Sequence, residues 1–293
     1  MRVLLLGGAG MLGHKLCQRF REHFETWTTV RAGYRDYARY GLFDPERTLG
    51  GVDAVDFDSV VRAVAEVKPD AVINCIGIIK QLKAAKDPIV SLSINSLFPH
   101  RLANLCRASG ARLIHISTDC VFSGRKGMYS EADVSDAEDL YGRSKFLGEV
   151  DQPGCLTLRT SIIGRELCSA TGLIEWFLSN RGGKVRGFSG AVYSGFTTLA
   201  LTRIIADVLK GQPGLTGLYQ VSSDPINKYE LLKLVNRTYS LNIAVEPDTT
   251  FRCDRSLDSS RFRQATGFQP PSWPEMIEEM HRDPTPYQDW RTP

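Results

Sequence analysis

The sequence lacks the cysteine spacings of a metal site and the even cysteine count of a disulfide framework. None of its seven cysteines forms a Cys-x-x-Cys pair, and they stand at Cys17, Cys75, Cys106, Cys120, Cys155, Cys168 and Cys253. An odd number of scattered cysteines is typical of reduced thiols. The pattern therefore predicts a cytoplasmic protein and no metal centre.

Long apolar runs and runs of one charge are also missing. The first apolar run, Val3–Leu6, breaks at Gly7 and is too short for a signal peptide. No stretch approaches the ~18 apolar residues of a membrane span. The 36 basic and 33 acidic side chains are mixed along the chain, and the formal net charge is +3. This balance argues against a nucleic-acid partner, which needs a basic run or face, and the sequence predicts no membrane partner.

What the sequence does contain is a regular alternation of apolar runs and helical patterns in its first half. Strands are predicted at 2–6, 26–31, 71–75, 112–117 and 155–160, and helices at 11–20, 58–67, 89–109 and 141–150. Strands that alternate with helices of this length form βαβ units. The fold class is therefore α/β, a Rossmann-type doubly wound parallel sheet.

The rhythm loosens from about Ile163, which predicts a smaller C-terminal lobe over the carboxyl ends of the strands. Helices are expected at 197–209, 228–240 and 275–281, and a short strand at 217–221. We assign residues 1–162 to the sheet domain, with 195–225 returning to it. Residues 163–194 and 226–293 form the lobe.

A glycine-rich turn between the first strand and the first helix indicates a dinucleotide site. Gly7, Gly10 and Gly13 have the spacing Gly-x-x-Gly-x-x-Gly, and Met11 and Leu12 open the helix. Gly7 permits the tight turn, Gly10 lets the backbone approach a pyrophosphate, and Gly13 lets the helix pack closely. The helix N-terminus then faces the negative charge.

Basic residues follow the second predicted strand, where a site that prefers NAD often has an acid. Arg31 stands at the strand end, and Arg35 and Arg39 follow it. A guanidinium suits a 2′-phosphate by charge and geometry, so NADP(H) is favoured over NAD(H). The alternative is a solvated basic loop.

Two further segments are candidates for cofactor contact. Asp56 and Phe57 stand before a predicted helix, where they either bracket an adenine or, through Asp56, cap that helix. The segment Cys75-Ile76-Gly77 follows Asn74 at a strand end, where small residues permit close approach of the central part of a cofactor. A structural turn is the alternative there.

Tyr141 and Lys145 are four residues apart, which places a phenol and an ammonium on one face of a helix. A nearby cation favours the phenolate, so we expect Lys145 to lower the pKa of Tyr141. By itself the pair is also typical of a solvated helix.

Together with Ser117-Thr118-Asp119-Cys120-Val121-Phe122 and Tyr141-Gly-Arg-Ser-Lys145, these motifs resemble the extended short-chain dehydrogenase/reductases, in particular the dTDP-4-dehydrorhamnose reductase family. The resemblance implies a Rossmann domain for NADP and a lobe for a nucleotide-diphosphate sugar. It also implies a catalytic triad of Thr118, Tyr141 and Lys145. The expected reaction is NADPH-dependent reduction of the 4-keto group of a nucleotide-activated 4-keto-6-deoxy sugar, for polysaccharide or deoxysugar biosynthesis.

The resemblance also suggests substrate-binding residues and leaves alternatives open. Cys120 lies two residues after Thr118, where related epimerase/reductases have an acid–base cysteine, but 171–174 lacks the histidine that would partner it. Arg252 and Arg255 resemble the family's substrate loop. Other candidates are a sugar-nucleotide epimerase/reductase, a reductase of a UDP-N-acetyl-4-keto sugar, and a non-catalytic NADP-binding regulatory subunit.

Some relatives hold magnesium at a dimer interface through C-terminal glutamates. Glu275, Glu278 and Glu279 stand near the end of this chain, and we expect them to form a solvated helix face. A homodimer remains an open alternative.

Overall fold

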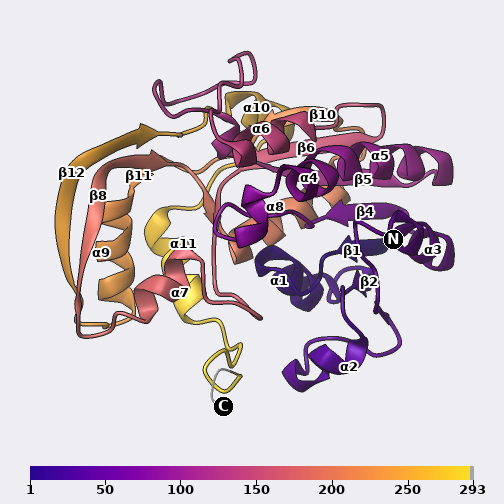
Figure 1. The fold of residues 1–293 in the computed structure, drawn as a ribbon, viewed down its shortest axis with the longest axis horizontal. Helices are drawn as coiled ribbons and strands as arrows, with labels where there is room; N and C mark the ends of the chain where they lie inside the picture. The colour runs from indigo at the N-terminus through magenta and orange to yellow at the C-terminus, as the bar shows by residue number, and fades with distance from the viewer. Residues whose placement is uncertain (291–293) are drawn as a thin grey trace.

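The computed structural model describes residues 1–290, the side chain of Lys83 excepted, and has a seven-stranded parallel sheet at its centre (Figure 1). In spatial order the strands are β10 (Gly217–Gln220), β6 (Cys155–Thr160), β5 (Arg112–Thr118), β4 (Ala71–Asn74), β1 (Arg2–Leu6), β2 (Glu25–Thr29) and β3 (Thr48–Leu49). The chain runs outward from β1 to β3 and then crosses to β4. The switch point between β1 and β4 is where open α/β sheets bind ligands. The predicted Rossmann-type sheet is confirmed.

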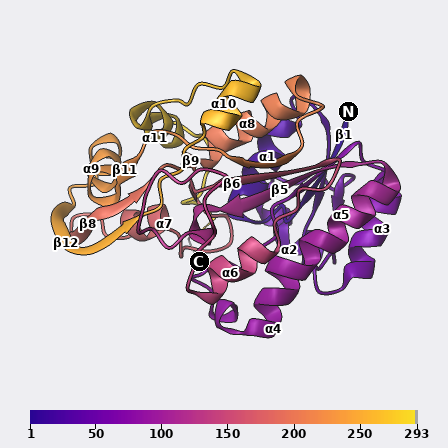
Figure 2. The same ribbon diagram turned by 90° about the horizontal axis from the view of Figure 1, so that it is seen from above.

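Helices cover both faces of this sheet, as Figure 2 shows. The helices are α1 (Met11–Phe20), α2 (Tyr34–Tyr37), α3 (Phe57–Val67), α4 (Pro88–Ser91), α5 (Phe98–Ser109), α6 (Leu140–Leu147), α7 (Leu173–Leu178), α8 (Thr198–Gly211), α9 (Lys228–Thr238), α10 (Ser260–Thr266) and α11 (Trp273–His281). Alternate residues of β1 enter two separate cores: Val3 and Leu5 pack on the α1 and α8 side, and Leu4 and Leu6 on the α3 and α5 side. A strand covered on both faces is apolar throughout, which explains its sequence.

A second, three-stranded sheet lies at the left of Figure 1. It consists of β11 (Ile226–Asn227), β8 (Lys184–Tyr193) and β12 (Ala244–Asp254), with α9 packed against β8. Between the two sheets, β7 (Ile162–Ile163) pairs with β9 (Phe196–Thr197). The chain then returns to the large sheet through α8 and β10, which pairs with β6.

Besides short elements that the sequence does not predict, such as α7 and α10, the structure differs from the sequence-based expectation at three longer elements. The predicted helix at 89–109 is divided into α4, the π-helix η3 (Leu92–Leu97) and α5. The long strands β8 and β12 were not expected, because β12 is exposed along most of its length and has no apolar repeat. The last helix begins at Trp273, two residues earlier than expected, because Ser272 and Glu275 form a capping box.

Three short 3₁₀ turns connect longer elements: η1 (Ala38–Tyr40), η2 (Lys83–Lys86) and η4 (Asp119–Val121). Within residues 1–290, no helix combines the length and the hydropathy needed to cross a bilayer. The glutamates near the chain end have local partners: Glu275 caps α11, Glu278 pairs with Arg282 at 2.7 Å, and Glu279 pairs with Arg203.

Candidate active site

The three residues predicted to be catalytic meet at the carboxyl end of β5. Thr118 is the last residue of β5, and its hydroxyl accepts a hydrogen bond from the Cys120 backbone at 3.1 Å. Tyr141 lies in the first turn of α6, and the nearby Thr118 hydroxyl acts to lower the pKa of its phenol. Lys145, one turn later, donates from Nζ to the carbonyl of Ile116 at 2.8 Å. The hydroxyl, the phenol and the ammonium therefore surround one strand end.

Capping and small residues bring α6 this close to the strand. Asp139 caps the helix by accepting a hydrogen bond from the backbone of Gly142 at 2.8 Å. A Cβ on Gly142 would lie 2.2 Å from the carbonyl oxygen of Cys120, and one on Gly148 would lie 1.8 Å from that of Asn95. Neither position has room for a side chain, so both glycines set the approach of α6.

The pKa values at this site follow burial. The pKa of Tyr141 is raised well above its usual value, chiefly by burial of the phenol, and nearby Cys120 and Asp119 act in the same direction. The expectation that Lys145 lowers the pKa of Tyr141 is therefore wrong for this structure. Burial also lowers the pKa of Lys145, to about 8. Both groups are displaced toward their neutral forms, as expected for groups removed from water.

The glycine-rich turn has the close contacts that its sequence requires. Gly7 has a φ of +84°, and a Cβ there would lie 3.0 Å from the Ile76 side chain. A Cβ on Gly13 would lie 2.2 Å from the carbonyl oxygen of Gly7. Gly10 is exposed, and within residues 1–290 a Cβ there would contact the Gly7 oxygen at 3.3 Å. The turn is thus closed on the protein side and open at Gly10, before the first backbone N–H groups of α1 at Met11 and Leu12.

The segment after β4 connects this turn to Lys145. Cys75 and Ile76 contact Gly7, and a Cβ on Gly77 would lie 4.0 Å from Nζ of Lys145. Asn95, on η3, holds the segment through hydrogen bonds with the backbone N–H and C=O of Ile78 at 2.9 and 3.1 Å. Asn95 is a buried amide whose hydrogen-bonding groups are satisfied, so its role is structural.

The remaining candidates for cofactor contact lie further out along the same edge. Arg31 is exposed, two residues after β2. Asp56 is the N-cap residue of α3 but makes no capping hydrogen bond with its side chain, which instead pairs with Arg62 at 3.5 Å. The capping alternative is therefore wrong. Phe57 is half-buried, and the Arg101 guanidinium covers its ring with Cζ 4.0 Å from the ring centre.

Of the substrate-binding candidates, the structure brings together Cys120 and Arg255. Arg255 donates from Nε to the carbonyl of Phe122 at 2.8 Å, and its Nη1 lies 3.6 Å from the Cys120 sulfur. Burial raises the pKa of the Cys120 thiol to about 12, so it is a neutral group. Arg252 is exposed on β12 opposite Gly190, outside this cluster.

Sequence reasoning missed the polar groups that β8 and α9 add near this end of β5. Asp119 is buried, and burial raises its pKa, while the charges of Arg255 and Lys228 act to lower it. The Tyr193 hydroxyl is buried without a hydrogen-bond partner among the described residues. Tyr193 and Lys228 stand on β8 and α9, more than seventy positions after Asp119, and carry no local motif. No group of three or more His, Cys, Asp or Glu in residues 1–290 is arranged to hold a metal ion.

The chain is similar to known proteins over its first half and, more weakly, over its full length. The family model described as "RmlD substrate binding domain" matches residues 1–167. Methionine adenosyltransferase 2 subunit beta of Danio rerio is 30% identical over 57% of this chain and 49% of its own length. dTDP-4-dehydrorhamnose reductase of Streptomyces griseus is 32% identical over 50% of this chain and 43% of its own. The chain thus spans about half the length of these relatives.

Other similarities extend over nearly the whole chain. dTDP-4-dehydrorhamnose reductase of Aggregatibacter actinomycetemcomitans is 25% identical over 95% of this chain and 98% of its own length. The crystal structure of a dTDP-4-dehydrorhamnose reductase from Bacillus anthracis in complex with NADP has a TM-score of 0.78 at 22% identity. The match covers 95% of this chain and 98% of the Bacillus anthracis chain. The Bordetella bronchiseptica enzyme WbmG in complex with NAD also has a TM-score of 0.78, at 21% identity. That match covers 99% of this chain and 93% of the WbmG chain. These two structures share the fold.

Proposed function

The chain belongs to the RmlD substrate binding domain family, and on this premise we propose that it is an NADPH-dependent reductase. Its substrate is the 4-keto group of a nucleotide-activated 4-keto-6-deoxy sugar, in polysaccharide or deoxysugar biosynthesis. The observation that carries the proposal is the convergence of Thr118, Tyr141 and Lys145 beside the segment that contacts the glycine-rich turn. A proton donor and a dinucleotide turn are thus adjacent.

The residues at the turn fit a dinucleotide. Gly10 is exposed and a Cβ there would crowd the Gly7 oxygen at 3.3 Å, and among the described residues no side chain caps the first N–H groups of α1. Such a helix end binds a pyrophosphate. Gly7 and Gly13 shape the turn, Cys75, Ile76 and Gly77 line the path toward Lys145, and Asp56 and Phe57 are candidates for the adenine end. When bound, the nicotinamide supplies a hydride.

The chain's own residues protonate and stabilise the negative charge that develops on the ketone oxygen. The raised pKa keeps Tyr141 protonated at neutral pH, which is the state that a proton donor requires. Lys145 orients the cofactor ribose and carries positive charge near the phenol. The Thr118 hydroxyl donates to Asp119 at 3.1 Å in this structure, so it must exchange this partner to donate to the substrate.

The lobe, residues 163–194 and 226–293, holds the nucleotide-diphosphate sugar in this proposal. Arg255 is the best-placed cation because it already lies beside Cys120 at the end of β5. Arg252 is exposed on β12 and lies outside this cluster, so it is the weaker candidate for contact with the diphosphate. The neutral Cys120 thiol, without a histidine at 171–174, favours simple reduction over epimerisation.

A regulatory, non-catalytic subunit is the second candidate, because one similar protein is named a subunit beta of methionine adenosyltransferase 2. The discriminating experiment follows the nicotinamide absorbance while the protein is mixed with NADPH and a panel of dTDP- and UDP-linked 4-keto sugars. We expect steady consumption of NADPH with at least one 4-keto-6-deoxy sugar. Tight binding of NADPH with no consumption on any sugar would instead favour the regulatory subunit.

The pH dependence of the reaction is expected to report the titration of Lys145. Its pKa is lowered to about 8, so the ammonium is present below this pH and is lost above it. We expect kcat/KM for NADPH to fall about tenfold per pH unit above about 8, because this ratio follows the free enzyme. The measurement is a pH profile of initial rates from neutral to alkaline buffer. A level profile through this range would contradict the role of Lys145.

The preference for NADP(H) is expected to depend on Arg31, which is exposed at the end of β2. Arg31→Ala should raise the KM for NADPH by about 5- to 20-fold and leave that for NADH unchanged, because a charge-assisted contact with the 2′-phosphate is lost. Arg107→Ala on α5 is the matched control, since it removes the same charge from an exposed site away from the turn. An unchanged ratio of the KM values for NADPH and NADH in Arg31→Ala would show that Arg31 does not set the cofactor preference.

A further inference from the structure

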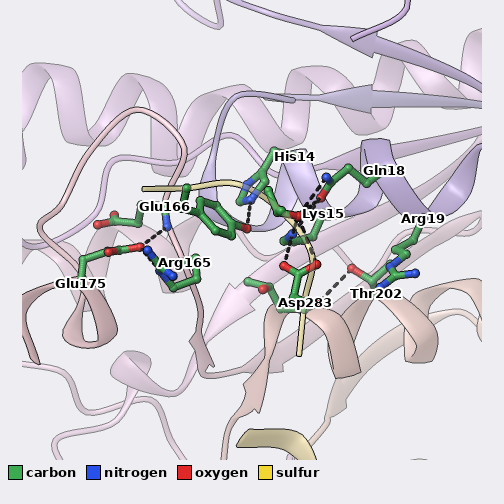
Figure 3. Close-up of polar contacts among 12 residues, drawn as sticks. His14, Lys15, Gln18, Arg19, Arg165, Glu166, Glu175, Thr202 and Asp283 are labelled. Carbon is green, nitrogen blue, oxygen red and sulfur yellow. Dashed lines mark hydrogen bonds and ion pairs between the residues drawn. The ribbon is translucent and has the colours of Figure 1, made fainter. Parts of the chain in front are cut away.

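After α11 the chain folds back onto α1 as an irregular segment that ends in a turn, residues 283–290, which we call the C-terminal strap (Figure 3). Its first contact is with Lys15 of α1, a residue that is only 1% exposed. The Lys15 ammonium donates to Asp283, to the Thr285 hydroxyl at 2.7 Å and to Gln18 at 2.8 Å. An ammonium has three protons, so all of its donors are satisfied, two of them by the strap.

The second contact is with His14, which is completely buried. Its Nδ1 lies 2.9 Å from the carbonyl oxygen of Gly10, and its Nε2 lies 2.7 Å from the hydroxyl of Tyr287 in the strap. A carbonyl only accepts, so Nδ1 carries the proton and Nε2 accepts from the Tyr287 hydroxyl. Burial lowers the pKa of His14 to about 4, which is consistent with this neutral tautomer.

The Gly10 carbonyl and the Met11 N–H belong to one peptide unit, at the point where the glycine-rich turn enters α1. It also accepts the His14 backbone N–H at 3.1 Å, so two donors from one residue hold it. In a trans peptide the C=O and the following N–H point in opposite directions. Fixing the Gly10 carbonyl toward His14 therefore directs the Met11 N–H outward, at the open side of the turn.

The strap reaches two other segments that border the same edge. The Arg165 guanidinium, held by Glu175 at 2.7 Å, lies 4.6 Å from the centre of the Tyr287 ring. The Trp290 ring packs 5.1 Å from that of Tyr40, in the segment that follows Arg31. The strap thus connects the turn, the chain after β7 and the predicted 2′-phosphate side of the site.

We propose that the C-terminal strap is a positioning element of the dinucleotide site, acting through the hydrogen-bonded chain from Tyr287 to His14 to Gly10. His14 and Tyr287 are positioning residues: they hold the backbone that would contact the pyrophosphate. This inference rests on the proposed binding of a dinucleotide and extends it to residues at the far end of the chain.

The first test is Tyr287→Phe, which removes the hydroxyl and keeps the ring. We expect the Kd of NADPH, measured by titration of its fluorescence, to rise about 3- to 10-fold, the equivalent of one hydrogen bond, while kcat at saturation changes less than about twofold. Tyr239→Phe is the matched control, because the Tyr239 hydroxyl is buried without a hydrogen-bond partner among the described residues. Equal Kd values for Tyr287→Phe and Tyr239→Phe would overturn the proposal. Failure of the wild-type protein to bind NADPH would instead refute the proposed function.

The second test uses the wild-type protein and does not depend on the stability of a variant. If strap docking favours NADPH binding, NADPH must favour strap docking by the same factor. Saturating NADPH should therefore slow hydrogen exchange in peptides that cover 283–290 by about 3- to 10-fold, and less so in Tyr287→Phe. Unchanged exchange of the strap while NADPH is bound would overturn the proposal.

Discussion

Tyr141→Phe is expected to lower kcat by about 10²–10⁴-fold while the Kd of NADPH stays within about twofold of the wild-type value. The size follows from the usual contribution of a positioned general acid. Burial and the neighbouring thiol and carboxyl raise the pKa of Tyr141, so the phenol is fully protonated at neutral pH and is the proton source at the end of β5. The change removes one oxygen and leaves the packing of α6 intact. Initial rates and fluorescence titration measure the two quantities.

Tyr239→Phe again provides the control, since it removes a phenolic hydroxyl from the lobe and should leave kcat unchanged. Thr118 remains in Tyr141→Phe, so a small residual rate is compatible with the assignment. Turnover at the wild-type rate in Tyr141→Phe would refute Tyr141 as the proton donor.

Glu149→Gln is expected to lower the free energy of unfolding by about 3–5 kcal/mol, because it leaves a buried guanidinium without its counter-charge. The side chains of Arg159 on β6 and Glu149 after α6 are only 5% and 6% exposed. Arg159 donates from Nε to Oε1 of Glu149 at 2.7 Å and from Nη2 to Oε2 at 2.6 Å. Glu149 also accepts from the Ser117 hydroxyl at 2.7 Å, directly before Thr118. The pair therefore anchors α6 to the strand end that carries the site. Urea denaturation measures the loss.

The control for this prediction replaces both charges, in the double variant Glu149→Met with Arg159→Met. Removal of a whole buried pair is often close to neutral, whereas removal of one partner is costly. We therefore expect the double variant to recover most of the stability that Glu149→Gln loses. If Glu149→Gln alone were as stable as the wild-type protein, the ion pair would have no anchoring role.

The sheet domain could be predicted because its signals are local. The turn from Gly7 to Gly13 follows an apolar strand, and Asp139 starts α6 so that Tyr141 and Lys145 share a face. The lobe could not be predicted in the same way. Strand β12 is largely exposed and β8 is only partly buried, and the two pair with each other across more than fifty residues, so neither shows a clear apolar period. The π-helix η3 is likewise invisible in an apolar pattern, because it changes only the hydrogen-bond register.

The sequence by itself determined the kinds of groups present and their local spacing: the open glycine turn, the Thr118 hydroxyl at a strand end, and the Tyr141 and Lys145 pair one helical turn apart. Only the tertiary structure decided their state. Burial, which depends on the whole fold, raises the pKa of Tyr141 where spacing alone predicted a lower one. Packing likewise brought Arg255 to Cys120 and left Arg252 exposed. It also joined His14 to Tyr287, 273 positions away, because only the folded chain places the C-terminal strap against the first helix.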